Sequence, residues 1–415
     1  METTFYQKHR KELEQIRDET RAQLLEDIIP FWEKRVVDRE WGGYYNCFDR
    51  EGRLYDTTKQ GWFVGRNMYT FSALYNRIEP RDEWLAIAQA GRDYMNTSFA
   101  AGDGRFHQEL DRCGGVITGT DSIFTDHFAV KGLYEYITAA SKTEDEQELY
   151  YAKTLSDSLF RHVDDEAVLR REGIPDGWQK HAVNFMNLIV ALESRPLFGS
   201  AYEEIARGCV HKSLYEFASD EYEAPFETIR KDGTPCLQGA GRIIDAGHTM
   251  ESLWFCMRAG LEFDEPSWIS RAGHVMDWVI SRCYDKTYGG FIQHVDVDRK
   301  CPEHEFLTTD YHGIPVGWED KIWWVQAEAQ FALLMSGILN ENEGHFACFK
   351  ELYDYTGRYF RDREYGEWYS VLNRDGSVLC DKKGFALKGA YHIPRCLMQM
   401  VTLLDWFLQS RRCAV

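Results

Sequence analysis

The stretch GGYYNCFDREG, residues 42–52, joins two glycines, two aromatic residues, a short alternating run and a charged turn that Gly52 closes. Short alternation followed by a turn closed by glycine is typical of a small strand or hairpin. Similar stretches return at 104–114 (GRFHQELDRCG), 225–233 (PFETIRKDG), 289–300 (GGFIQHVDVDRK) and 366–376 (GEWYSVLNRDG). Such recurrence along the chain predicts a repeat architecture.

Glycines give the period of this repeat. Gly43, Gly104, Gly290 and Gly366 are separated by 61, 186 and 76 residues. The middle interval holds three periods of about 62 residues each. The copy at 225–233 fills one of the two missing places, and we assign the weaker stretch VLRREGIPDG, residues 168–177, to the other. The sequence therefore predicts six hairpin-like connections.

Helical periodicity occupies the intervals between these copies, two segments to each interval. The predicted helices are 5–28, 61–79, 83–97, 122–139, 148–163, 182–195, 203–218, 245–259, 266–283, 321–338, 344–360 and 385–409. Six connections among twelve helices predict six helix pairs closed in a ring, an all-α (α/α)6 barrel with short β-hairpins. No linker rich in Pro or Ser interrupts the pattern, so we expect one domain, residues 1–415.

The predicted helices are of two kinds. Those that follow a repeat copy are apolar on most faces, such as AVNFMNLIVALE (182–193) and IWWVQAEAQFALLMSGIL (322–339). The alternate ones are amphipathic and charged, such as EQELYYAKTLSDSLF (146–160). A helix that is apolar all round is buried, and a striped helix lies outside. We therefore expect the first kind to form an inner ring and the second kind an outer ring.

Composition narrows the functional class. The formal net charge is −19, which opposes binding to nucleic acid or to anionic lipid. No apolar run is long enough to span a bilayer, and the first residues lack the apolar core of a signal peptide. The 11 cysteines are an odd number without a C-x-x-C pair, as expected of reduced thiols. We expect a cytoplasmic protein without nucleic-acid or membrane partners.

Polar residues gather near the starts of the six predicted inner helices. If the ring forms, these starts meet at one mouth, and polar groups among aromatic walls are typical of a small-molecule site. In chain order the candidates are Arg66, Asp126, Asn187, His248 with Glu251, Trp323 and Trp324 with Glu328, and Lys388 with His392 and Arg395.

His248 and Glu251 lie three residues apart, so that a helix places them on one face. They could bind a metal ion, move a proton, or satisfy each other in a core. A metal site would need a third protein ligand, for which His392 is available. Arg66 and Arg395, however, bring cations to the same mouth, and cations favour an anionic transition state over a metal.

Proton transfer needs two titratable groups that face each other across a pocket. The unperturbed pKa of histidine, about 6.5, suits this role. In this interpretation His248 and His392 exchange protons with opposite faces of one carbon, and Arg66 stabilises the developing oxyanion. Glu251 would hold the imidazole of His248, and Arg395 would bind substrate oxygens.

Several motifs, in order along the chain, resemble the N-acylglucosamine 2-epimerase family. They are RNMYTF (66–71), AGHTMESLW (246–254), DKIWWVQAEAQFALL (320–334), GEWYSVLNRDG (366–376) and KGAYHIPRCL (388–397). The family includes N-acylglucosamine, cellobiose and mannose 2-epimerases, and aldose–ketose isomerases. The resemblance implies an (α/α)6 barrel and proton transfer at C2 of a ring-opened sugar through an enediolate. It implies no metal and no cofactor, and it suggests a homodimer.

The resemblance also implies roles for single residues. The catalytic histidines of the family fall on His248 and His392, its essential arginine on Arg66, and its glutamate on Glu251. For substrate binding, the resemblance points to Arg395, Trp323, Trp324 and Glu328. From their places near the starts of the inner helices we add Asn187, Asp126 and Lys388.

The third inner helix indicates the branch of the family. Cellobiose 2-epimerases and aldose–ketose isomerases carry an extra histidine there, where this chain has Asn187. Its AVNFM (182–186) is similar to the AVPMM-like stretch of N-acylglucosamine 2-epimerases. We therefore predict interconversion of N-acylglucosamine and N-acylmannosamine. The alternatives are epimerisation or aldose–ketose isomerisation of unsubstituted sugars, and, more remotely, a glycoside hydrolase that uses Glu251 with Glu328 or Asp126.

Overall fold

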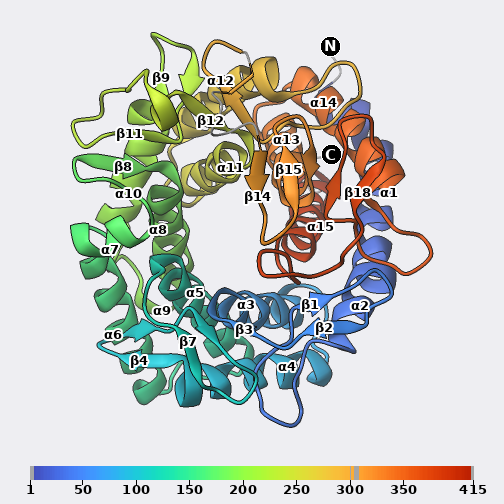
Figure 1. Ribbon diagram of the computed structural model, residues 1–415. Helices are drawn as coiled ribbons and strands as arrows, with labels where there is room; N and C mark the ends of the chain where they lie inside the picture. Colours follow the sequence, from blue (N-terminus) through green and yellow to red (C-terminus); the bar gives the residue numbers. More distant parts are fainter. Residues whose placement is uncertain (1–3, 300, 303–307, 413–415) are drawn as a thin grey trace.

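The computed structural model describes residues 4–299, 301–302 and 308–412. Its helices form two concentric rings (Figure 1). Helix α13 is buried along nearly its whole length, which explains why apolar residues cover all of its faces. The inner ring consists of α3 (Gly61–Arg77), α5 (Ile123–Ala139), α8 (His181–Glu193), α11 (Ala246–Glu262), α13 (Trp323–Leu339) and α15 (His392–Arg412).

Each inner helix packs against an outer helix that buries only one stripe of its surface. Four outer helices end in a wider π-helical turn, at residues 23–28, 95–99, 212–216 and 356–360. After the first of these turns the chain continues as α2 (Ile29–Glu33). The outer ring consists of α1 (Phe5–Ala22), α4 (Asp82–Tyr94), α6 (Glu146–His162), α10 (Glu203–His211), α12 (Pro266–Cys283) and α14 (Glu343–Tyr355).

Contacts between neighbouring inner helices run without a break around the ring. Helix α3 contacts α5, α5 contacts α8, and the series continues through α11 and α13 to α15, which contacts α3 again. The predicted (α/α)6 barrel is thus confirmed. One helix start was wrong: the sixth inner helix begins at His392 and not near 385, because residues 385–388 form a small turn closed by an isolated bridge between Phe385 and Lys388.

Short strands occupy the connections at one end of the barrel. The first half of the chain contains β1 (Cys47–Phe48), β2 (Leu54–Asp56), β3 (Lys59–Gln60), β4 (Ala100–Gly102), β5 (Arg105–Phe106), β6 (Glu109–Leu110), β7 (Val116–Thr118) and β8 (Trp178–Lys180). The second half contains β9 (Ala218–Ser219), β10 (Ala224–Pro225), β11 (Thr228–Arg230), β12 (Ile243–Asp245), β13 (His294–Asp296), β14 (Thr308–Asp310), β15 (Pro315–Gly317), β16 (Lys321–Ile322), β17 (Val371–Leu372) and β18 (Val378–Cys380).

These strands connect each repeat to the next. The strands β3, β8, β12 and β16 run directly into inner helices, and each pairs antiparallel with a strand from the following connection: β6, β11, β13 and β17. The pairing fixes the starts of these inner helices at one mouth of the barrel. The copy assigned to 168–177 was wrong, since residues 166–171 form the short helix α7 (Glu166–Arg171) and the strand β8 comes later.

A tight turn recurs in the connections at DREWGG (38–43), DKTYGG (285–290) and DREYGE (362–367). In each turn the first aspartate accepts hydrogen bonds from main-chain N–H groups two and three residues later. The same aspartates lie against fully buried lysines. Burial raises their carboxyl pKa values, but main-chain N–H groups and the arginines Arg112, Arg374 and Arg50, followed by the lysines, outweigh burial and keep these pKa values well below the usual range. The pairs are Asp38 with Lys59, Asp285 with Lys321 and Asp362 with Lys383.

Two glycines bring the inner helices α3 and α5 into close contact. A Cβ atom added to Gly65 would lie 2.2 Å from the main-chain carbonyl of Phe128, and one added to Gly132 would lie 2.4 Å from the carbonyl oxygen of Gly65. Both separations are far shorter than a carbon–carbon contact. The start of α3, which carries Arg66, therefore depends on the absence of a side chain at these positions.

We predict that Gly65→Ala lowers the free energy of unfolding by about 1–3 kcal/mol, because the added methyl forces the two helices apart. Gly208→Ala is the matched control: Gly208 is also helical, but an added Cβ there meets no atom within 4 Å, so helix propensity should raise stability by up to about 1 kcal/mol. Denaturant unfolding at equilibrium measures both changes. Equal effects of the two substitutions would contradict the close-contact explanation.

Candidate active site

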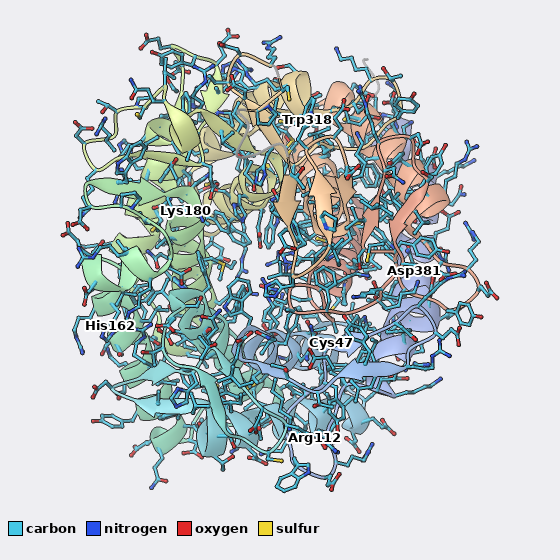
Figure 2. The ribbon with its side chains drawn as sticks, viewed as in Figure 1. Cys47, Arg112, His162, Lys180, Trp318 and Asp381 are labelled. Carbon is cyan, nitrogen blue, oxygen red and sulfur yellow. The ribbon has the colours of Figure 1, made fainter. Side chains whose placement is uncertain are left out.

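A pocket of about 310 Å³ opens at the mouth where the inner helices begin. Its walls are mainly aromatic, from Trp62, Phe124, Phe128, Phe185, Trp323 and Trp324. The hairpin of β14 and β15 reaches over this mouth in Figure 1 and contributes Thr309, Asp310 and Tyr311. Lys180, at the end of β8, lies on another side of the mouth (Figure 2). The remaining polar lining consists of Arg66, Glu172, His248, Glu251, Gln293 and His392.

His248 lies in the first turn of α11, and 27% of its side chain is exposed to the pocket. Its main-chain N–H donates to the side chain of Asp245, which caps the helix, at 2.8 Å. Its imidazole lies between two aromatic rings, with centroid distances of 5.4 Å to Phe185 and 5.2 Å to Trp324. Packing on both sides restricts the orientation of the ring.

Two carboxylates face the Nδ1 atom of His248. Oε1 of Glu227 lies 3.1 Å from Nδ1, and Oδ2 of Asp245 lies 3.5 Å from it. Burial by itself lowers the pKa of His248, but the two negative charges outweigh burial and raise the pKa to about 9. At neutral pH this imidazole is therefore protonated and able to donate a proton.

His392 is the first residue of α15, and it also has a carboxylate at its Nδ1 but lies near a cation. Its Nδ1 lies 2.7 Å from Oε1 of Glu328, a buried residue of α13 that also accepts from the indole N–H of Trp254 at 2.9 Å. Burial and the guanidinium of Arg66 lower the pKa of His392 well below its usual value. The ring is therefore neutral: Nδ1 carries the hydrogen that Glu328 accepts, and Nε2 is left as a proton acceptor.

Trp324 lies next to both histidines. The centroid of its ring is 5.2 Å from His248 and 5.6 Å from His392. Trp323, one position earlier, is only 1% exposed and packs edge-on against Phe385. Of the two tryptophans, Trp324 forms the wall between the histidines and Trp323 mainly fills the core at the edge of the pocket.

The predicted contact between Glu251 and His248 is wrong. The carboxylate of Glu251 accepts a hydrogen bond from Nη2 of Arg395, the same atom that donates to Glu328 at 2.5 Å. Arg395 is only 1% exposed and does not line the pocket, so the prediction that it binds substrate oxygens is also wrong. The i, i+3 spacing allowed the predicted pair, but the buried guanidinium attracts Glu251 more strongly than an imidazole that already has two carboxylates.

Arg66 lies in the first turns of α3 and lines the pocket. Its guanidinium carbon is 4.1 Å from the ring centroid of Phe128 and 4.9 Å from that of Tyr391. No ion pair is formed by Arg66 within the ranges of the chain that the structure describes, and its buried Nε has no hydrogen-bond partner there. Burial lowers its pKa to about 10, so it remains charged at neutral pH. It is a cation held by aromatic faces, available to an anion in the pocket.

Four other predicted substrate-binding residues lie outside the pocket. One of them, Glu328, is fully buried and bound to His392 and Arg395. The carboxylate of Asp126 is buried and accepts from Arg105 and from the main-chain N–H of Phe106 at 3.0 Å. The side-chain oxygen of Asn187 lies 2.8 Å from Nε2 of His127. Lys388 is fully buried; it donates to the carbonyl oxygen of Trp368 and lies 3.3 Å from Glu367. Position near a helix start brought these residues to the mouth, but local partners direct their side chains away.

Sequence reasoning missed the residues that contact His248. Glu227 belongs to the repeat copy PFETIRKDG, whose pattern predicts only a short strand and a turn, and Asp245 is the first residue of the helix predicted over 245–259. An aspartate three positions before a histidine at a helix start is a recognisable N-cap signal, so that Asp245 could have been found. Glu227 lies 21 residues away in the sequence and is brought to His248 only by the fold.

Glu251, Glu328 and His392 each place a possible ligand atom within 4.8 Å of the others. This spacing would suit a metal ion, but the guanidinium of Arg395 already lies between the two carboxylates. A metal ion would have to displace a buried cation from two charge-assisted hydrogen bonds. The same geometry speaks against a glycoside hydrolase, because both carboxylates are bound to one arginine and do not face each other across the pocket.

The model of the N-acylglucosamine 2-epimerase (GlcNAc 2-epimerase) family matches residues 43–396 of this sequence. The chain belongs to this family. It is 29% identical over 402 residues to the N-acylglucosamine 2-epimerase of Homo sapiens, covering 93% of this chain and 90% of that protein. It is 23% identical to a cellobiose 2-epimerase of Bacteroides fragilis, covering 93% of this chain and 98% of that protein. The family membership makes the chain a carbohydrate epimerase or isomerase.

The fold agrees with solved structures of the family. The cellobiose 2-epimerase of Spirochaeta thermophila superimposes with a TM-score of 0.79 at 21% identity, covering 96% of this chain and 99% of that chain. Among the residues that the structure describes, no helix combines the length and the apolar character needed to cross a bilayer.

We predict that chelators leave the catalytic rate of the enzyme unchanged, because a guanidinium fills the place that a metal ion would need. The measurement compares turnover before and after prolonged dialysis against a strong chelator, with metal content determined by elemental analysis. A large loss of activity that a divalent cation restores would contradict this assignment of Arg395.

Proposed function

We propose that the chain interconverts N-acylglucosamine and N-acylmannosamine by proton transfer at C2. The observation that carries the proposal is the pair of histidines on one pocket, with Trp324 beside both of them and with opposite charge states. A base and an acid of matched position are what inversion at one carbon requires. The relatives from mouse, rat, human and cattle that share 27–29% identity with this chain are named N-acylglucosamine 2-epimerases.

The chemistry follows from the resting protonation states. Nε2 of His392 removes the proton from C2 of the ring-opened sugar, and the electron pair of that bond forms the C1–C2 double bond of an enolate whose C2 carries the acylamino group. The former C1 carbonyl oxygen becomes negatively charged, and Arg66 stabilises it. His248 then gives a proton to the opposite face of C2, and the C1 carbonyl returns. In the reverse reaction the histidines exchange roles.

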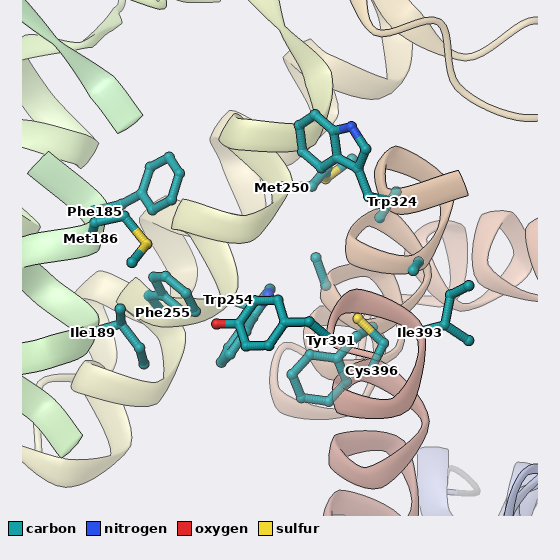
Figure 3. Close-up of a cluster of buried hydrophobic side chains, with 14 of the residues drawn as sticks. Phe185, Met186, Ile189, Met250, Trp254, Phe255, Trp324, Tyr391, Ile393 and Cys396 are labelled. Carbon is teal, nitrogen blue, oxygen red and sulfur yellow. The ribbon is translucent and has the colours of Figure 1, made fainter. Parts of the chain in front are cut away.

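The apolar wall from α8 supports an acylated substrate. Ala182, Phe185 and Met186 line the pocket, and Figure 3 shows Phe185 and Met186 pointing from α8 toward the centre of the ring. Contact of an acyl methyl group with such a surface adds binding free energy, about 25 cal/mol per Å² of apolar area removed from water. A free 2-hydroxyl group would lose its hydrogen bonds to water there without replacement.

The test is hydrogen exchange at C2. Incubation with N-acetylglucosamine or N-acetylmannosamine in heavy water should place deuterium at C2 of both epimers, as read by NMR. Glucose, mannose and cellobiose serve as comparison substrates. Exchange confined to mannose with a ketose product would replace epimerisation by aldose–ketose isomerisation, and no exchange with any sugar would remove the proposal.

We predict that His248→Asn and His392→Asn each lower kcat by about 10²–10⁴-fold, because each removes one of the two proton-transferring groups. Circular dichroism should show unchanged helix content. His274→Asn is a control at a histidine of the outer helix α12, whose ring packs against Trp278, and its kcat should stay within a factor of two of wild type. Full activity of either active-site variant would contradict the two-histidine mechanism.

We predict that Arg66→Met lowers kcat by about 10²–10³-fold with a smaller effect on KM, because the charge of Arg66 is needed most where the enolate oxygen becomes negative. Arg66→Lys should recover part of the loss, since it restores the charge without the planar donor group. Steady-state kinetics in both directions provide the measurement. A variant that changes KM alone would assign Arg66 to ground-state binding.

A further inference from the structure

Glu227 is placed rigidly behind the imidazole of His248. It lies between β10 and β11, and its side chain is only 10% exposed. Its main-chain N–H donates to the carbonyl oxygen of Ile243 at 3.0 Å, and its carbonyl oxygen accepts from His181 at 2.8 Å. These bonds fix Glu227 to β12, which leads into α11, and to the first residue of α8. The backbone thus directs one carboxylate at the proton-donating histidine.

The two carboxylates near His248 differ in their other partners. Asp245 caps α11 and also lies 2.9 Å from Nε2 of Gln293 and 3.0 Å from Nε2 of His294. Neither carboxylate oxygen of Glu227 has a hydrogen-bond partner in the described part of the chain, where His248, at 3.1 Å, is the one group within ion-pair distance of it. Asp245 therefore has a structural task besides its charge, whereas the carboxylate of Glu227 is directed to His248 alone.

Further titratable groups face this pair from neighbouring elements. Lys180 at the end of β8 and the neutral His392 on α15 act weakly on His248. His181 is buried with Nε2 held 2.9 Å from Oγ of Ser252 and its ring stacked on Phe217. Burial lowers the pKa of His181 to about 4, so it brings no positive charge to Glu227. The negative charge of Glu227 is thus left for His248.

We propose that Glu227 is a positioning residue for catalysis: its carboxylate forms an ion pair with the Nδ1 side of His248, keeps Nε2 directed into the pocket and holds the imidazole in its proton-donating form. This inference rests on the proposed function of His248 and adds the residue that prepares it. The sequence predicted this positioning role for Glu251, but the carboxylate of Glu251 pairs with Arg395 instead. Support comes from the raised pKa of His248, about 9, to which Glu227 contributes after Asp245.

The test compares Glu227→Gln with Glu227→Asp in the pH dependence of kcat/KM. In the wild type, activity that needs protonated His248 falls as pH rises through about 9. Glu227→Gln keeps the size of the side chain but removes its charge, so the alkaline limb should move down by roughly one pH unit or more. Glu227→Asp keeps the charge at a longer distance, so it should lower the pH of the alkaline limb by less than Glu227→Gln does. Glu216→Gln, a partly exposed residue beside Gln179, is the matched control and should leave the limb in place.

A second readout does not depend on turnover. Only neutral imidazole reacts with diethylpyrocarbonate, so carbethoxylation of His248, read by peptide mass spectrometry, should begin about one pH unit lower in Glu227→Gln than in wild type. Coincident profiles of these two proteins would overturn the role of Glu227.

If the wild type shows no C2 exchange with any sugar but His248 still reacts as expected, the proposed function fails while the positioning contact stands. Should Glu227→Gln not fold, the same comparison is made with Glu227→Asp, whose unchanged profile would likewise overturn the role.

Discussion

The buried guanidinium of Arg395 is the contact on which the site depends. It lies on α15, only 1% exposed, and its Nη2 binds Glu251 of α11 and Glu328 of α13, while Nη1 donates to the hydroxyl of Tyr391 at 2.8 Å. Three inner helices are thereby joined at the mouth of the ring. Removal of one partner from such a buried pair typically costs about 3–5 kcal/mol, because the other charge is left without compensation. The ion pairs therefore hold the mouth in one arrangement.

The same contact creates the difference between the two histidines. Because Glu328 is fixed by Arg395, it can hold Nδ1 of His392, and the nearby cation Arg66 keeps that imidazole neutral. His248 has carboxylates on its Nδ1 side and is protonated. One residue type thus serves as base and as acid within a single pocket, because two carboxylates outweigh burial at His248, whereas burial and the cation Arg66 prevail at His392.

Much of the fold could be predicted because recurring glycines and helical periodicity mark the repeat in the sequence. Most helix bounds agree within a few residues, since a helix that is apolar all round and a helix with one stripe differ plainly in sequence. The exceptions are local. Residues 168–171 are helical, although the repeat predicted a hairpin there, and α15 begins only at His392. Neither departure follows from periodicity, because each depends on local features, the cap of Asp165 before α7 and the turn of residues 385–388 before α15.

The candidate site was predicted in part. Position at a helix start was enough to bring Arg66, His248 and His392 to one pocket. It could not give side-chain partners, which explains the errors at Asp126 and Lys388: Arg105 and the carbonyl of Trp368 hold them elsewhere. The pairing of Glu251 with His248 failed for the same reason. Competition among buried charges is decided by three-dimensional distance, and sequence spacing reports only the neighbours on one helix.

The central claim is that the resting enzyme holds one histidine charged and the other neutral. The most direct measurement is an NMR titration of ¹⁵N-labelled histidine side chains, with the two signals assigned from the single asparagine variants. We expect His248 to stay protonated up to about pH 9, and His392 to stay neutral at neutral pH with its hydrogen on Nδ1. Two signals that titrate together near the ordinary histidine pKa of about 6.5 would contradict it.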